Sequence, residues 1–117
     1  MTGALLVFAG GGAGSTVRYF IGLLMRTTGV TLPLATFISN ITACLIFAIF
    51  IYADRNRHFG HHMHLLLLTG FCGGLSTFST FGYETWLLLA GHQWLAASLN
   101  VVVSTVASIF LFFLATR

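Results

Sequence analysis

Four long apolar stretches constrain the fold of this chain more than any other feature. A helix needs about 20 consecutive apolar residues to cross the hydrocarbon core of a bilayer. The stretches that meet this requirement lie at residues 4–25, 34–52, 65–90 and 95–115. Their connections are short, so neighbouring helices should run in opposite directions. The sequence therefore predicts one all-α domain over residues 1–117, with four transmembrane helices.

The composition agrees with a membrane protein and excludes several other classes. Only 6% of the residues are charged and 57% are hydrophobic, whereas a soluble domain carries about 25% charged residues. The net charge of +3 comes from scattered arginines, which is too little for a nucleic-acid-binding patch. The N-terminus lacks the basic region and cleavage site of a signal peptide, so the first stretch is expected to be retained. Cys44 and Cys72 lie in apolar stretches and are expected to be buried thiols.

The third apolar stretch is too long for a single straight span. Residues 65–90 would reach about 39 Å as one helix, against a hydrocarbon core of about 30 Å. We predict a break near residues 73–77, where two glycines precede Ser76 and Thr77. Freed carbonyls at membrane depth must face protein, water or an ion, so a break would indicate function. The alternative is close helix packing through two GxxxG pairs, Gly10 with Gly14 and Gly70 with Gly74.

Polar residues form short rows within the second and fourth stretches. Thr36 and Asn40 lie one turn apart in the second stretch, and Asn100 and Ser104 repeat that spacing in the fourth. Polar groups in hydrocarbon are costly and need a partner or a function. Such residues either form hydrogen bonds between helices or line a polar path.

Two phenylalanines bracket two hydroxyl residues just after the predicted break. Phe78 and Phe81 are three residues apart, hence on the same side of a helix, with Ser79 and Thr80 between them. Phenylalanine at this spacing usually packs in a core. Here the positive ring edges could instead attract an anion in a narrow path, where hydroxyl groups would replace its lost water.

The few charged and titratable residues define no catalytic centre. Arg18 and Glu84 are expected to pair, to line a vestibule or to reach the membrane surface. The histidines of residues 58–64 are expected to form a solvated loop rather than a metal site. There is no nucleophile with a neighbouring base, and residues 10–15 do not complete a dinucleotide-binding fingerprint. The sequence therefore does not indicate an enzyme.

The arginines specify the orientation in the membrane only weakly. Arg55, Arg57 and Arg117 are expected on one side, and Arg26, with Arg18 near the end of the first helix, on the other. The positive-inside rule then favours cytoplasmic termini by a small margin. Insertion in both orientations, with an antiparallel dimer, is therefore also compatible with the sequence.

Three segments resemble the Fluc/CrcB family of fluoride channels. GFCGGLSTFSTF (residues 70–81) is similar to the family's third-helix signature. GGGAGSTVRY (residues 10–19) is similar to its glycine-rich first helix, and PLATFISN (residues 33–40) to its second-helix segment. The resemblance covers nearly the whole chain, and the third-helix motif is highly specific.

The resemblance implies a passive, fluoride-selective channel that exports toxic fluoride across the bacterial cytoplasmic membrane. Family members are dual-topology homodimers of two inverted copies in the lipid bilayer, with two anion pathways at the interface. A structural sodium ion at the dimer centre would be held by backbone carbonyls of Gly73 and Ser76. The residues implied for the fluoride pathway are Thr36, Asn40, Phe78, Ser79, Thr80, Phe81, Asn100 and Ser104.

Some positions depart from the family pattern, and two alternatives remain. Ser76 replaces a frequent threonine, Ala43 and Cys44 stand where Gly-Ser or Gly-Ala is usual, and Asn100 stands where some members have tyrosine. A small multidrug exporter has a similar size, but its proton coupling needs a carboxylate in the first helix, which is absent here. The chain could also be a non-conducting partner subunit of a heterodimeric channel.

Overall fold

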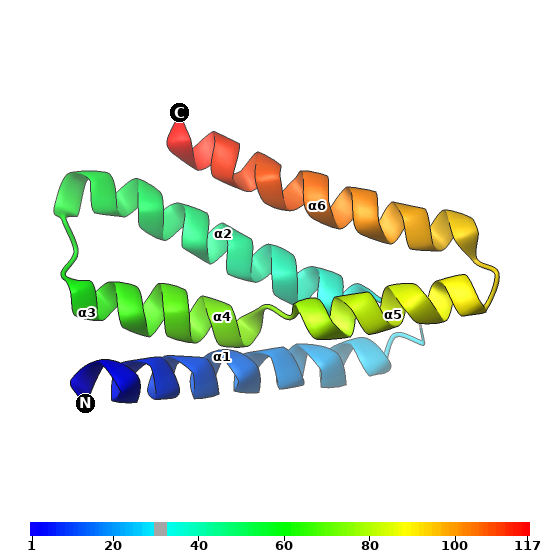
Figure 1. Ribbon diagram of the computed structural model, residues 1–117, viewed down its shortest axis with the longest axis horizontal. Helices are drawn as coiled ribbons and strands as arrows, with labels where there is room; N and C mark the ends of the chain where they lie inside the picture. Colours follow the sequence, from blue (N-terminus) through cyan, green and yellow to red (C-terminus); the bar gives the residue numbers. More distant parts are fainter. Residues whose placement is uncertain (30–32) are drawn as a thin grey trace.

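The chain folds into a bundle of long helices, described by a computed structural model for residues 1–29 and 33–117 (Figure 1). The first two long helices are α1 (Thr2–Arg26) and α2 (Leu34–Arg57). A third segment combines α3 (His61–Met63), the π-helix η1 (His64–Cys72), α4 (Gly73–Leu75) and, after an interruption, α5 (Phe78–Ala90). The last helix is α6 (Trp94–Thr116).

Four helical segments are long and apolar enough to cross a membrane. They are Thr2–Arg26, Leu34–Arg57, His61–Ala90 and Trp94–Thr116, with mean hydropathies of 1.3, 2.3, 1.4 and 2.1. The prediction of an all-helical protein with four apolar spans is confirmed. Large apolar side chains such as Leu5, Ile49 and Leu99 are exposed, as expected for a surface that lipid covers.

The segments alternate in direction along the long axis of the bundle. The N-terminus, the α2–α3 connection and the C-terminus lie at one end (Figure 1). The α5–α6 turn lies at the other end, where α1 also finishes. Arg55, Arg57 and Arg117 therefore lie at the first end, and Arg26 at the second.

Glycines allow α1 to lie directly against η1 and α4. A Cβ atom added at Gly14 would lie 2.1 Å from the carbonyl oxygen of Phe71, and one added at Gly74 would lie 2.3 Å from that of Gly11. A Cβ atom added at Gly10 would lie 2.1 Å from the carbonyl oxygen of Leu66, and one added at Gly70 would lie 3.0 Å from the Cα atom of Gly10. The backbones approach this closely only because no side chain separates them. The two GxxxG pairs thus serve close helix packing.

The third segment leaves the helical conformation at Ser76 and Thr77. Ser76 has φ −78° and ψ 157°, and Thr77 has φ −151° and ψ 119°, both extended. Gly73 and Gly74 remain helical in α4, as does Leu75, so Ser76 and Thr77, rather than the glycines themselves, carry the change of direction. This connection lies near the middle of the bundle's long axis (Figure 1).

The histidine-containing connection is held by a carboxylate. The Asp54 side chain accepts hydrogen bonds from the Phe59 backbone N–H and pairs with His64 Nε2 at 3.0 Å. His58, His61 and His62 are exposed. Within residues 1–29 and 33–117, no group of three or more His, Cys, Asp or Glu side chains could hold a metal ion.

Candidate functional site

The side chain of Asn40 on α2 holds the extended residues between α4 and α5. Its Oδ1 accepts from the Thr77 N–H at 2.7 Å, and its Nδ2 donates to the Thr77 carbonyl at 3.2 Å. One amide therefore satisfies both backbone groups of a residue that lies outside any helix. In hydrocarbon such groups must find partners within the protein. Asn40 also keeps a second Nδ2 hydrogen, which can donate elsewhere.

Thr77 begins the second half of the interrupted segment by capping α5. Its hydroxyl oxygen accepts from the Thr80 N–H at 3.3 Å and donates to the Thr80 hydroxyl at 3.0 Å. The Ser79 hydroxyl lies 3.3 Å from the same oxygen. Ser79 and Thr80, two of the predicted pathway residues, thus form one hydroxyl cluster with Thr77.

The carbonyl groups of Gly74 and Gly73, just before the interruption, differ in their hydrogen bonding. The Gly74 carbonyl accepts from Arg18 Nε at 3.1 Å and from the Ser15 hydroxyl at 3.3 Å. In an unbroken helix the Gly73 carbonyl would accept from the Thr77 N–H, but that N–H donates to Asn40 instead. Gly73 is exposed. Among the described residues, its carbonyl oxygen therefore lacks the N–H partner that a continuous helix would provide.

The two phenylalanines of the motif lie side by side at the start of α5. Their ring centroids are 5.9 Å apart, with planes inclined by 35°. Phe78 is 84% exposed, and Phe81 is half-buried. Phe78 therefore packs against little within its own subunit, and core packing does not account for it.

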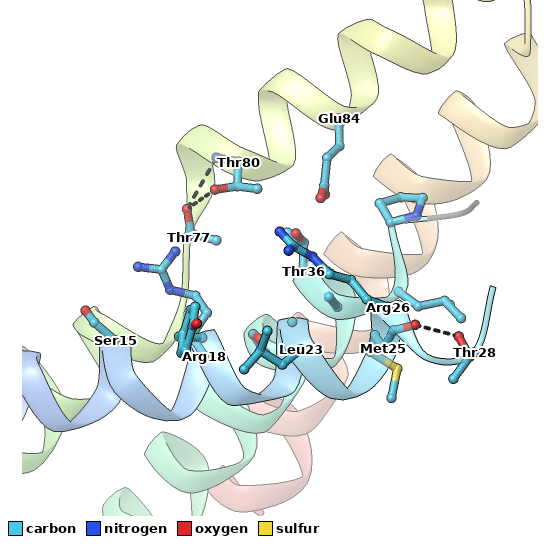
Figure 2. A pocket seen from close by; sticks show the side chains of 16 residues that line it. Ser15, Arg18, Leu23, Met25, Arg26, Thr28, Thr36, Thr77, Thr80 and Glu84 are labelled. Carbon is cyan, nitrogen blue, oxygen red and sulfur yellow. Dashed lines mark hydrogen bonds between the residues drawn. The ribbon is translucent and has the colours of Figure 1, made fainter. Parts of the chain in front are cut away.

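A cavity of about 580 Å³ lies between α1, α2 and α5 beside this cluster (Figure 2). Figure 2 shows Glu84 pointing from α5 toward the cavity and Arg26 reaching in from α1, while Arg18 extends from α1 toward Thr77 at the interruption. The hydroxyl groups in its lining belong to Ser15, Tyr19, Thr28, Thr36, Ser39, Thr77 and Thr80. Two guanidinium groups against one carboxylate, with many hydroxyl groups, form a polar chamber suited to a hydrated anion.

Two polar groups at this chamber lack partners among the described residues. The Glu84 Oε2 and the Ser39 hydroxyl oxygen are buried and form no hydrogen bond within residues 1–29 and 33–117. Ser39 itself is 1% exposed. Buried polar atoms normally have a partner, so water or an ion in the chamber would complete their hydrogen bonding.

The polar row on α6 lies apart from the chamber. Asn100 Nδ2 donates to the Thr85 hydroxyl at 2.9 Å, and Thr85 in turn donates to the Phe81 carbonyl at 2.8 Å. Ser104 is buried, and its hydroxyl oxygen has no partner among the described residues. These two residues are not part of the chamber's lining, whereas Thr36, Thr80, Arg18 and Glu84 are.

Several residues of the site were not predicted from the sequence. Thr77 precedes a helix and is a preferred N-cap type, so its capping role had a recognisable signal. Thr85 follows Phe81 by four residues, the spacing for a hydroxyl that donates back to the helix. Ser15 and Ser39 had no distinguishing signal beyond being polar in an apolar stretch, and Arg26, just after the first stretch, was considered only for its effect on orientation.

These features together define a multi-pass membrane protein with a polar chamber beside an interrupted third helix. The family described as "CrcB-like protein, Camphor Resistance (CrcB)" matches residues 5–116. The chain belongs to this CrcB family.

Curated relatives cover most of the chain. It is 42% identical over 109 residues to the "Fluoride-specific ion channel FluC" of Nitratidesulfovibrio vulgaris, covering 92% of this chain and 88% of the relative. It is 40% identical over 114 residues to the protein of that name from Pyrococcus furiosus, covering 93% and 89%. It is 38% identical over 108 residues to that of Pectobacterium atrosepticum, covering 92% and 85%.

Proposed function

We propose that this chain forms a passive, fluoride-selective ion channel that exports toxic fluoride across the bacterial cytoplasmic membrane. The observation that carries the proposal is the 38–42% identity, over nine tenths of the chain, to relatives named as fluoride-specific ion channels. A channel is a transporter and not an enzyme. No contact among the described residues favours a proton-coupled exporter.

The proposed conducting unit is an inverted homodimer. Phe78 is 84% exposed although it belongs to the most distinctive motif of the chain. A second copy packed antiparallel would cover the ring and complete a narrow path along it. The arginines at the two ends of the bundle differ by so little that both orientations in the membrane are accessible.

A sodium ion is proposed at the centre of this dimer, bound by the carbonyl oxygens of Gly73 and Ser76. The Gly73 carbonyl fits this role, because its helical donor is turned toward Asn40 and its residue is exposed. The Gly74 carbonyl is already occupied by Arg18 and Ser15. The proposal therefore requires a third helix that is broken within the membrane, and the extended dihedral angles of Ser76 and Thr77 support it. A cation bound there would supply positive charge in a poorly screened environment.

The proposed fluoride pathway begins in the chamber and continues along α5. Arg18, Arg26 and Glu84 would act at its vestibule, where Thr36 and Thr80 line the wall. Further along, Ser79 and Thr80 would offer hydroxyl groups, and Phe78 and Phe81 their positive ring edges. Asn40 would donate its second Nδ2 hydrogen while the first still holds Thr77. Asn100 and Ser104 would contribute from α6. Water is thus replaced stepwise as the ion sheds it.

Passive efflux from liposomes tests the proposal directly. Liposomes that contain the purified protein are loaded with potassium fluoride or potassium chloride, and external fluoride or chloride is followed with an ion-selective electrode. Fast fluoride loss with negligible chloride loss is expected, without any imposed proton gradient. Equal loss of both ions, or fluoride loss only with a proton gradient, would contradict it. A folded protein that releases no fluoride would instead point to a partner subunit, which co-expression would supply.

A further inference from the structure

A second, apolar concavity lies between α2 and α6, on a part of the bundle that the proposed pathway does not use. This α2–α6 groove is about 270 Å³ and is lined by Leu45, Ala48, Ile49, Tyr52, Leu111, Leu114 and Ala115. Two alanines, Ala48 and Ala115, lie among larger side chains. Because their side chains are small, they leave a hollow in the surface of the two helices.

Three guanidinium groups lie at the end of the bundle that this groove approaches. Arg55 is three residues beyond Tyr52 on α2, and its Nη2 donates to the Thr116 carbonyl at 3.1 Å, which ties α2 to the end of α6. The Arg117 guanidinium lies 4.3 Å from the centre of the Phe113 ring. Arg57 is exposed nearby in sequence. An arginine has five N–H donors, so Arg55 and Arg117 keep most of theirs for another ligand.

The one carboxylate at this end, that of Asp54, forms no salt bridge with these arginines in the described part of the chain. Asp54 is engaged by the Phe59 N–H and by His64. No other contact between an acidic and a basic side chain is found within residues 1–29 and 33–117. Three guanidinium groups and one carboxylate therefore leave this end of the bundle with a net positive charge.

We propose that the α2–α6 groove binds one acyl chain of an anionic glycerophospholipid, whose phosphate is bound by Arg55 and Arg117. Inside the membrane the groove must be filled by an apolar group such as an acyl chain. Beyond its end, the arginines favour the binding of a lipid phosphate. Arginine binds phosphate oxygens in a forked, charge-assisted geometry. Tyr52, 58% exposed between groove and charges, is the residue type that favours the level of lipid headgroups. This site does not depend on the proposed channel function.

The shape of the groove favours a lipid chain over a second copy of the protein. Pockets for whole drug-sized ligands have about 300–1,000 Å³, so this smaller groove fits a single flexible chain. A helix, about 10–12 Å across with its side chains, could cover the groove but not enter it. A covering helix would also leave the cationic end without an anion.

Native mass spectrometry tests the site with two lipids that share acyl chains and differ in charge. Purified protein in detergent is mixed with equal amounts of palmitoyl-oleoyl phosphatidylglycerol and phosphatidylcholine. Retention of phosphatidylglycerol is expected to exceed that of phosphatidylcholine about tenfold. The double variant Arg55→Gln, Arg117→Gln should remove the preference. Arg26→Gln, a charge change at the opposite end of the bundle, should leave it. Equal retention of both lipids by the unaltered protein would overturn the proposal.

A second pair of variants tests the groove separately from the charges. Ala115→Phe fills the groove and should lower retention of phosphatidylglycerol, whereas Val106→Phe, on an exposed part of the same helix, should not. Unchanged retention in Ala115→Phe, with the lipid displaced by glycerol 3-phosphate, would mean a headgroup site only and would overturn the groove assignment.

Photo-crosslinking decides the occupant even where a groove variant fails to fold. Benzoylphenylalanine in place of Ile49, at the lip of the groove, should form a lipid adduct on illumination in phosphatidylglycerol vesicles. A covalent protein dimer in place of the lipid adduct would show that a second copy covers this surface, and the proposal would be wrong.

Discussion

Asn40 joins two requirements that usually conflict in a membrane protein. A polar side chain at membrane depth is costly, and so is a backbone residue without helical hydrogen bonds. Here each satisfies the other, because the Asn40 amide pairs with both backbone groups of Thr77. The extended conformation of the interruption therefore depends on one side chain from a different helix.

Replacement of Asn40 by alanine should destabilise the protein and abolish fluoride efflux. It would leave the N–H and carbonyl of Thr77 unpaired, at a cost of about 1–3 kcal/mol for each group. Thermal unfolding in detergent, followed by helical circular dichroism, measures the first effect, and the liposome assay measures the second. Asn56→Ala, an exposed position on the same helix, is the matched control. Equal melting temperatures of the two variants would refute the proposed role of the amide.

Replacement of Phe78 by isoleucine should reduce fluoride efflux without unfolding the subunit. The ring is 84% exposed, so its loss removes little packing, but the variant lacks the positive ring edge. A loss of about 1.4 kcal/mol of stabilisation along the path would slow efflux about tenfold. Phe8→Ile is the control, because Phe8 is 80% exposed on α1. Unchanged efflux in Phe78→Ile would exclude the ring from the pathway.

At the level of helices, the contact of α1 with η1 and α4 depends on particular glycines. Gly14→Ala would place a Cβ atom 2.1 Å from the Phe71 carbonyl oxygen, so one of the two backbones must shift. Overpacking of this kind costs about 1–3 kcal/mol. Gly12 lies on the same helix with nothing within 4 Å of an added Cβ, and alanine there favours the helix by up to about 1 kcal/mol. Gly14→Ala should therefore melt at a lower temperature than the parent, and Gly12→Ala at the same temperature or higher. The reverse order would contradict this packing.

The helices and the motif could be predicted from the sequence more fully than the contacts that organise them. The lengths of the apolar stretches alone predict the four spans, because a helix needs about 20 apolar residues to cross the hydrocarbon core. The sequence predicts the interruption near residues 73–77, but Gly73 and Gly74 stay helical. A glycine pair that breaks a helix and one that allows close helix packing have the same sequence, so the sequence alone could not distinguish them. The π-helix η1 has no residue signature. The pairing of Asn40 with Thr77 joins residues 37 apart, which no local pattern reveals.

For the whole molecule, sodium should be needed to hold two subunits together. Removal of sodium by exhaustive exchange into N-methyl-D-glucamine should lower the melting temperature and the fraction of dimer, because the carbonyls at the dimer centre would face one another without a cation. Added sodium should restore both, and potassium should not. Size-exclusion chromatography coupled to light scattering gives the oligomeric state. A dimer equally stable in both buffers would exclude a structural sodium ion.

The balance of arginines between the two ends should set the orientation of each copy, and efflux should need both orientations. Thr2→Arg with Asn56→Arg adds charge at the end with both termini, and His92→Arg with Gln93→Arg adds it at the end with the α5–α6 turn. Each pair should force one orientation, because added arginines hold a loop in the cytoplasm. All four positions are exposed, so the fold should not change.

A C-terminal tag probed from both sides of the membrane reports orientation, and fluoride efflux from cells reports function. Each variant alone should have its tag on a single side and lose efflux, since no inverted partner exists. Co-expression of the two should restore it. Full efflux from a variant whose copies all face one way would contradict the inverted dimer while leaving the fluoride channel itself untouched.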